Sequence, residues 1–118
     1  MNWRIRKLRQ NLIVYNNRKL FAHEIEIKIG SFSDFVFDED YKLKNLSDLE
    51  KFIKTYKHLP NVPSEQEVVK NGLNLGEMDA LLLEKVEELT LYIIELNKKI
   101  AKQEKKIEIL QIHIQNKN

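Results

Sequence analysis

Hydrophobic spacing in the middle of the chain is that of short helices with clear start and stop signals. Ser47 and Glu50 form a capping-box pair ahead of apolar residues at i, i+3, i+4 and i+7, which predicts a helix over residues 48–57. Pro60 and Pro63 end this helix, because a proline forces the residue before it away from helical geometry.

Two further helix starts follow. Ser64 and Glu67 repeat the capping box for a short helix, which Gly72 closes because glycine suits the left-handed position after a helix. Asn74 and Glu77 give a third start, and from Glu77 onwards no Gly or Pro interrupts the chain. A single helix of about 39 residues, roughly 58 Å long, is predicted. A compact chain of 118 residues is only about 35 Å across, so this helix must protrude.

The predicted long helix carries a heptad repeat, whose positions are lettered a to g. Nine of its ten a and d residues are apolar, and they form the predicted oligomer seam: Leu82, Val86, Leu89, Ile93, Leu96, Ile100, Gln103, Ile107, Leu110 and Ile114. The start of the helix is apolar over a wider arc and can bury itself against the first short helix and the Phe-rich loop before it. Beyond Asn97 nothing in the same chain is left to cover the seam, so self-association is predicted. A helix lying on a membrane is the alternative, which the mixed Lys and Glu face disfavours.

The number of associating helices is open at this stage. Ile at a with Leu at d favours two parallel strands, whereas the wide apolar arc offers surface for three. Only Lys99 at g and Glu104 at the next e form an attractive flanking pair, so charges set the register weakly. The expected partner is a second copy of this chain, in a homotrimer or a homodimer.

The first third of the chain shows the alternation of a β hairpin. Residues 12–15 and 21–29 are apolar segments that flank Asn16 and Asn17, and asparagine tolerates the positive φ of tight turns. In the second segment Phe21, His23, Ile25, Ile27 and Ile29 fall on one face and mostly polar residues on the other, as in a half-buried strand. The predicted fold class is therefore α+β: a β hairpin over residues 1–30, a small helical cap over 31–75 and a long coiled-coil helix over 76–118.

Composition narrows the class of protein. Hydrophobic residues make up 42% and charged residues 32%, with three Gly, two Pro and no cysteine, which is typical of a helix-rich chain without disulfides or thiolate metal sites. No apolar run approaches the roughly 18 residues of a membrane span. The apolar run after the basic start is also too short for the core of a signal peptide, so no export signal is predicted and the location stays open.

Charge is strongly segregated along the chain. Residues 1–19 hold six basic and no acidic side chains, residues 20–97 hold eight basic and sixteen acidic, and residues 98–118 hold six basic and two acidic. The basic arm of Arg4, Arg6, Lys7 and Arg9 suggests an alternative function, a nucleic-acid-binding adaptor with a dimeric coil. No nucleic-acid-binding module surrounds the arm, so a partner-facing segment is the preferred interpretation.

Candidate chemistry is sparse, and no catalytic, cofactor-binding or metal-binding residue is assigned. The acidic cluster of Asp38, Glu39 and Asp40 lacks the spacing and central glycine of a calcium loop. His58 follows a predicted helix end, where a histidine is favoured by the last carbonyl groups and the helix dipole. Gly72 lies in no phosphate-binding or dinucleotide motif. An enzyme is not expected, and neither is a small-molecule substrate.

Several sequence blocks resemble the C-terminal domain that ends many fibrous proteins of Bacteroidota and their phages. The two most specific are His58-Leu59-Pro60-Asn61-Val62-Pro63-Ser64 and Asn74-Leu75-Gly76-Glu77-Met78, within similar stretches at residues 35–43, 57–64, 71–78 and 86–92. Residues 12–27 are similar to the β repeat that precedes this domain in tail-fibre-like proteins. The resemblance implies a β-fibre end joined to a helical cap and a threefold coiled coil, with the β segments of a parent fibre as partners and a cell-surface or virion location.

The layout also resembles the intramolecular chaperone domains that terminate phage tailspikes, which trimerise a fibre and can then cut themselves off. That resemblance implies a register-setting assembly function. In the corresponding region Ser31, Ser33 and Lys42 are the only candidates for self-cleavage, and no serine–lysine spacing among them matches the tailspike motif. No self-cleavage site is therefore assigned.

Overall fold

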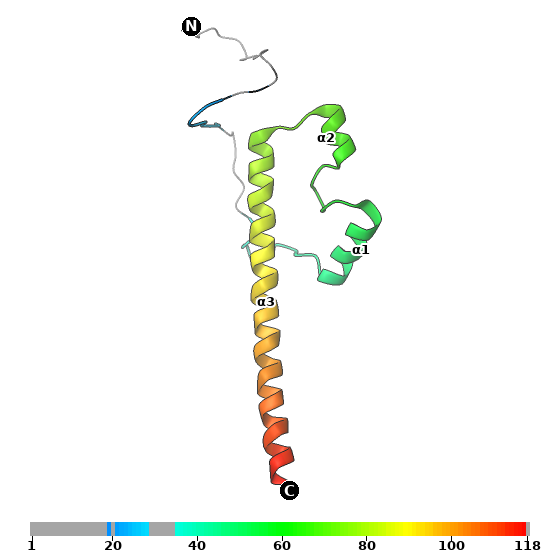
Figure 1. Ribbon diagram of the computed structural model, residues 1–118, viewed down its shortest axis with the longest axis vertical. Helices are drawn as coiled ribbons and strands as arrows, with labels where there is room; N and C mark the ends of the chain where they lie inside the picture. The colour runs from blue at the N-terminus through cyan, green and yellow to red at the C-terminus, as the bar shows by residue number, and fades with distance from the viewer. Residues whose placement is uncertain (1–18, 20, 29–34, 118) are drawn as a thin grey trace.

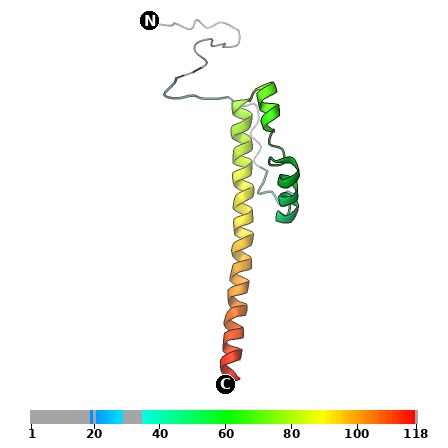
Figure 2. The same cartoon turned by 45° about the vertical axis from the view of Figure 1, so that its right-hand side comes forward.

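Three helices make up the regular structure of the part of the chain that the computed structural model describes, residues 19, 21–28 and 35–117 (Figure 1). They are α1 (Leu46–Tyr56), α2 (Glu65–Asn71) and α3 (Leu75–Asn116). We call residues 35–74, which precede α3, the headpiece. Figures 1 and 2 show α1 and α2 beside the first half of α3, while the second half projects beyond them.

The start of α1 differs from the sequence prediction. Asn45 is the N-cap, and its side-chain oxygen accepts a hydrogen bond from the backbone N–H of Asp48 at 2.8 Å. The predicted capping box of Ser47 and Glu50 is therefore wrong, because Ser47 already lies inside the helix. Asparagine caps a helix as well as serine does, and the earlier start adds Leu46 to the apolar face. The helix ends at Tyr56, followed by Lys57 in the left-handed region at φ 61°.

The predicted starts of α2 and α3 are confirmed. Ser64 and Glu67 form both bonds of the capping box. Gly72 follows α2 with the positive φ expected of it, 76°, but its ψ of −176° places it outside the left-handed helical conformation that was predicted. The side chain of Asn74 accepts from the backbone N–H of Glu77 at 3.1 Å. α3 then runs without interruption for 42 residues, about 63 Å at 1.5 Å per residue. The prediction of one long protruding helix holds.

The α+β fold class is wrong, because the described residues contain helices and no strand. Residues 21–28, most of the second predicted arm, are exposed and unpaired with any described segment, with Phe21 87% and Ile25 59% exposed. Alternating polarity produces a strand only where a neighbouring strand supplies hydrogen bonds, and a two-stranded ribbon is marginal in water even when formed. The first predicted arm, residues 12–15, lies outside the described residues. Over its described part the chain is all-α.

The hydrophobic core is small. Among the described residues, Val36 and Tyr92 are the only buried hydrophobic side chains, 2% and 7% exposed. Neither α1 nor α2 contains a buried residue. The described helices also include none with the length and apolarity needed to cross a membrane. The headpiece is therefore held on α3 by a few contacts rather than by an extensive apolar interface.

Candidate oligomerisation interface

The predicted seam is an uninterrupted exposed stripe on α3. All nine of its apolar side chains are between 44% and 65% exposed, from Leu82 in the third turn to Ile114 in the last. Gln103, the single polar member, is exposed as well. One helix face therefore presents apolar residues to solvent over most of its length. Exposed apolar stripes of this extent are rare on monomeric proteins and are typical of interaction surfaces.

The headpiece covers a different face of the same helix. Lys85 and Tyr92 are buried and Leu81 and Glu88 are half-buried, whereas Val86 in the same turns stays 55% exposed. The half-buried side chains of these turns also include Ala80, Glu84, Glu87 and Leu91. At 100° per residue the covered side chains centre about 140° around the helix from the seam.

Of the wide apolar arc near the start of α3, Leu81, Leu91 and Tyr92 are covered, whereas Leu83 and Ile94 stay exposed. The expectation that the first short helix covers this arc is wrong, because α1 does not pack against α3 and contains no buried residue. The seam stays open even where the headpiece packs.

A polar cluster attaches the headpiece to the covered face. The hydroxyl group of Tyr41 donates a hydrogen bond to the carboxylate of Glu88, and the ammonium group of Lys85 lies 3.0 Å from that carboxylate and 3.9 Å from Glu84. Burial, then the hydrogen bond and charge of Glu88, raise the pKa of the Tyr41 hydroxyl well above its ordinary value of 10.0. The neutral hydroxyl is thus the favoured form, and it ties the segment before α1 to α3.

A second hydrogen bond places the start of α1 along α3. The hydroxyl group of Tyr92 donates to the backbone carbonyl of Lys44, directly before the N-cap of α1. Burial is the main cause that raises the pKa of Tyr92. Because Tyr92 projects from the covered face, this bond sets both the level and the side of α3 at which α1 begins.

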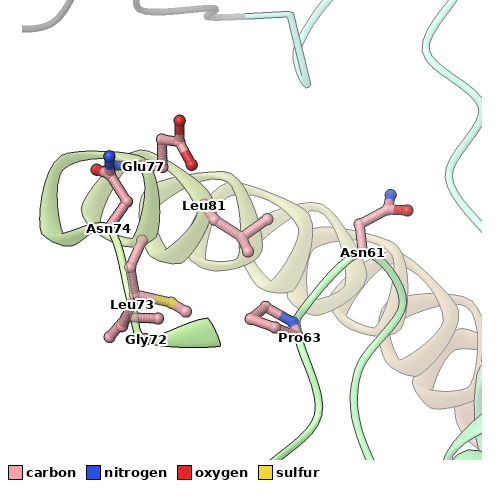
Figure 3. Close-up of a pocket in the computed structure, with 8 residues that line it drawn as sticks. Asn61, Pro63, Gly72, Leu73, Asn74, Glu77 and Leu81 are labelled. Atoms are coloured by element: carbon pink, nitrogen blue, oxygen red, sulfur yellow. The ribbon is translucent and has the colours of Figure 1, made fainter. Parts of the chain in front are cut away.

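The other end of the headpiece meets the first turns of α3. The loop that carries Asn61 and Pro63 faces Glu77 and Leu81 across a groove of about 250 Å³ (Figure 3). Asn61 has a positive φ of 63°, a conformation that asparagine tolerates better than most residues. The groove is smaller than the roughly 300 Å³ of typical ligand pockets, and Asn74 at its edge is engaged as the cap of α3. We therefore regard it as a structural corner.

The other candidate residues come together in no reactive site. The ring Nδ1–H of His58 donates a hydrogen bond to the Leu59 carbonyl at 2.9 Å, and the ring packs edge-on against Phe52. The acidic cluster of residues 38–40 and Lys42 are exposed. Within residues 19, 21–28 and 35–117, no group of three or more His, Asp or Glu side chains is arranged to hold a metal ion. Ser31 and Ser33 lie outside the described residues.

The basic arm of Arg4, Arg6, Lys7 and Arg9 also lies outside the described residues. No protein-family model matches the chain, and no curated protein or solved structure matches it either. The resemblance to fibre-terminal domains therefore stays a prediction from sequence blocks.

Sequence reasoning did not find the residues that attach the headpiece. Tyr41 and Glu88 are 47 residues apart, and nothing in the local pattern pairs them. Lys85 gave the only signal, because it is a lone base among Glu84, Glu87 and Glu88 on a helix that otherwise presents apolar residues nearby. A base surrounded by acids in such a place indicates a local ion-pair cluster.

Proposed function

We propose that this chain is a structural assembly module that associates with copies of itself through α3 and sets the register of the segments attached to it. The observation that carries the proposal is the division of α3 into two faces. One face holds the headpiece through Tyr41, Lys85 and Tyr92, while the a and d face remains exposed from Leu82 to Ile114. A helix that keeps its longest apolar stripe free of its own headpiece is suited to pack against another helix.

The seam favours parallel, in-register helices. In that arrangement Gln103 lies opposite Gln103 of the next copy, so the polar amides face each other and all the remaining layers of the seam are apolar. An antiparallel pairing over the same length places Gln103 opposite Ile93 and brings two copies of Lys99 together at the centre. Burying a polar amide against an aliphatic side chain leaves its hydrogen bonds unmade, which is costly.

Flanking charges favour the same orientation. In parallel helices Lys99 at g faces Glu104 at the next e of the neighbour. Within one chain Lys99 lies 3.0 Å from Glu95, but its ammonium group has three donors and can serve both carboxylates. The exposed pairs contribute little stability each and act mainly on orientation.

The proposed assembly has three helices. Apolar side chains flank the seam at Leu83 and Ile94, which are 39% and 46% exposed, so the apolar surface is wider than a strict two-stranded seam. The resemblance to fibre-terminal domains implies the same number. A two-stranded coil is the alternative, favoured by Ile at a with Leu at d.

Sedimentation equilibrium of the full chain over a wide concentration range tests the proposal. The expected result is a mass that reaches three times the 14.1 kDa of one chain and falls on dilution. A mass of twice that value replaces the trimer by the dimer and keeps the assembly function. A mass of one chain at the highest concentration contradicts self-association.

A further inference from the structure

Gln103 is the only polar residue of the seam, and the layers next to it are isoleucine. Ile100 and Ile107 occupy the neighbouring a positions, and all three side chains are exposed in the single chain. When parallel helices pack through the seam, each position becomes one layer around the common axis. Assembly therefore encloses the Gln103 amides between two aliphatic layers and removes them from water. A buried amide that makes no hydrogen bond is costly, so the layer needs partners for its polar atoms.

The most basic stretch of α3 surrounds this layer. Residues 98–108 hold five basic and two acidic side chains, whereas residues 75–97 hold one basic and six acidic. The five bases are Lys98, Lys99, Lys102, Lys105 and Lys106, and all are exposed. Within the described part of the chain, only Lys99 among them forms an ion pair, with Glu95 at 3.0 Å. Three copies of residues 98–108 carry a net charge of +9, within about 8 Å of Gln103 along the axis. The polar layer of the seam thus lies in a positive electrostatic potential.

Hydrogen bonds among three glutamine amides leave donors without partners. Each amide has two N–H donors and one carbonyl oxygen. A ring in which every amide donates to the carbonyl of the next copy uses one N–H of each. The second N–H then has no acceptor in the layer, and buried N–H groups without a partner are rarer in proteins than carbonyls with a free lone pair. A water molecule accepts two hydrogen bonds and brings two donors of its own, so it does not complete a threefold layer.

We infer that the assembled coil binds one small monovalent anion, such as chloride, on its axis at the Gln103 layer. Each copy gives the ion one amide N–H donor, and the ion brings no donor of its own. Amides turned the other way, with their carbonyl oxygens inward, suit a cation, which the positive charge of residues 98–108 repels. A divalent anion such as sulfate is disfavoured, because its desolvation between aliphatic layers costs far more.

This inference rests on the proposed three-helix assembly and names a ligand for it. In the single chain Gln103 is exposed and its amide is hydrated, so no site exists. In a two-stranded coil the two amides donate to each other, and their remaining N–H groups reach water at the edge of the seam. The anion therefore binds the trimer alone, and by mass action chloride shifts the equilibrium from single chains towards the trimer.

Sedimentation equilibrium of the full chain in two sodium salts tests the site. Sodium chloride is compared with sodium gluconate at the same ionic strength, so the screening of exposed charges is equal, and gluconate is too large for one seam layer. At about 150 mM salt, the association constant for three chains is expected to be about tenfold or more higher in chloride. A tenfold gain corresponds to a chloride Kd of about 15 mM.

Two glutamine variants separate the axial site from the exposed lysines. Gln103→Leu removes the amide layer and keeps every lysine, so it is expected to stay assembled and to lose the difference between the two salts. Gln115→Leu is the matched control, because Gln115 is exposed at position b, outside the seam. It is expected to keep the native preference for chloride.

Chloride NMR measures the binding directly, because the line of the ion broadens when the ion leaves its symmetrical hydration shell. Extra broadening is expected with the assembled native chain and with Gln115→Leu, and added bromide should reduce it by competition. Gln103→Leu should show no such broadening. Broadening that is equally strong in Gln103→Leu comes from the exposed lysines and contradicts the axial site.

The outcomes for the anion site and for the assembly are distinguishable. A trimer that associates equally in both salts, or a chloride effect that is unchanged in Gln103→Leu, overturns the anion site and leaves the coiled coil intact. A dimer in both salts also overturns the threefold site, while the proposed assembly function stands. A single chain at the highest concentration in both salts refutes the assembly and the anion site together.

Discussion

Replacing two seam residues by aspartate is the most direct test of the interface. Ile100 and Ile107 occupy successive a positions beyond the headpiece, where Figures 1 and 2 show α3 projecting past α1. They are 52% and 53% exposed in the single chain. No contact within the described part of the chain therefore explains why these two positions are apolar. Substituting them should act chiefly on association between chains.

The size of the effect follows from the exposed fraction. Fully burying an isoleucine side chain is worth about 1.5 to 3 kcal/mol, so burying the remaining half is worth about 0.7 to 1.5 kcal/mol. Two such residues in each of three copies give about 4 to 9 kcal/mol, and each 1.4 kcal/mol is tenfold in the association constant. The loss is therefore about three to six orders of magnitude. Carboxylates facing each other in the seam add desolvation and repulsion to this loss.

The assay is the solution mass by light scattering, with helix content by circular dichroism as the check on folding. The control variant carries the same substitutions at Ile109 and Ile112, which are 65% and 58% exposed on the far side of the helix. The seam variant is expected to be monomeric and helical, and the control to keep the native mass. An assembled seam variant, or equal dissociation of both variants, would show that the a and d stripe is not the interface.

Three further predictions concern the attachment of the headpiece. Tyr92→Phe leaves the Lys44 carbonyl without its donor and is expected to cost about 1 to 3 kcal/mol in thermal or denaturant unfolding. Lys85→Ala leaves two half-buried carboxylates close together, so it should lower the unfolding free energy more than Lys54→Ala, which removes only an exposed pair. The pKa of Tyr41 in the folded chain is raised above 10.0, so the stabilisation that its neutral hydroxyl gives is complete below pH 10 and is lost as the pH rises further. The fall in the free energy of unfolding above pH 10 should therefore be smaller in Tyr41→Phe than in the native chain.

Helix positions were predictable from sequence because their signals are local. The capping box at Ser64 and the cap at Asn74 are formed as predicted, and the long helix follows from the absence of Gly and Pro after Gly76 in its first turn. The cap of α1 was misplaced because Asn45 and Ser47 are both good cap residues two positions apart. The choice between them depends on whether Leu46 is helical, which the capping rules alone do not decide.

The hairpin prediction failed for a different reason. Alternation in residues 21–28 describes how a strand would present its side chains, but a strand also needs a partner, and none of the described segments supplies one. The resemblance to a β repeat has the same limit, since such repeats are stabilised by neighbouring chains or repeats. Period-two alternation therefore indicates a surface that can pair and does not establish pairing within one chain.

The attachment site was unpredictable because it depends on contacts distant in sequence. No local sequence pattern distinguishes Tyr41 from Tyr92, yet the hydroxyl of Tyr41 donates to a carboxylate and that of Tyr92 donates to a backbone carbonyl. Which face of α3 the headpiece occupies follows from these two bonds. The heptad pattern identified the seam but could not show that the headpiece leaves it open.

The small core and the open seam have a joint consequence for stability. Among the described residues only Val36 and Tyr92 are buried hydrophobics, so one chain gains little from packing its headpiece on α3. A partner that binds the folded chain and not the unfolded one raises the free energy of unfolding, by an amount that grows with the logarithm of the ratio of its concentration to its Kd. Packing of α3 against a second copy is such a binding event. The thermal midpoint of the headpiece should therefore rise with protein concentration in the native chain, and should not rise in the Ile100→Asp, Ile107→Asp variant.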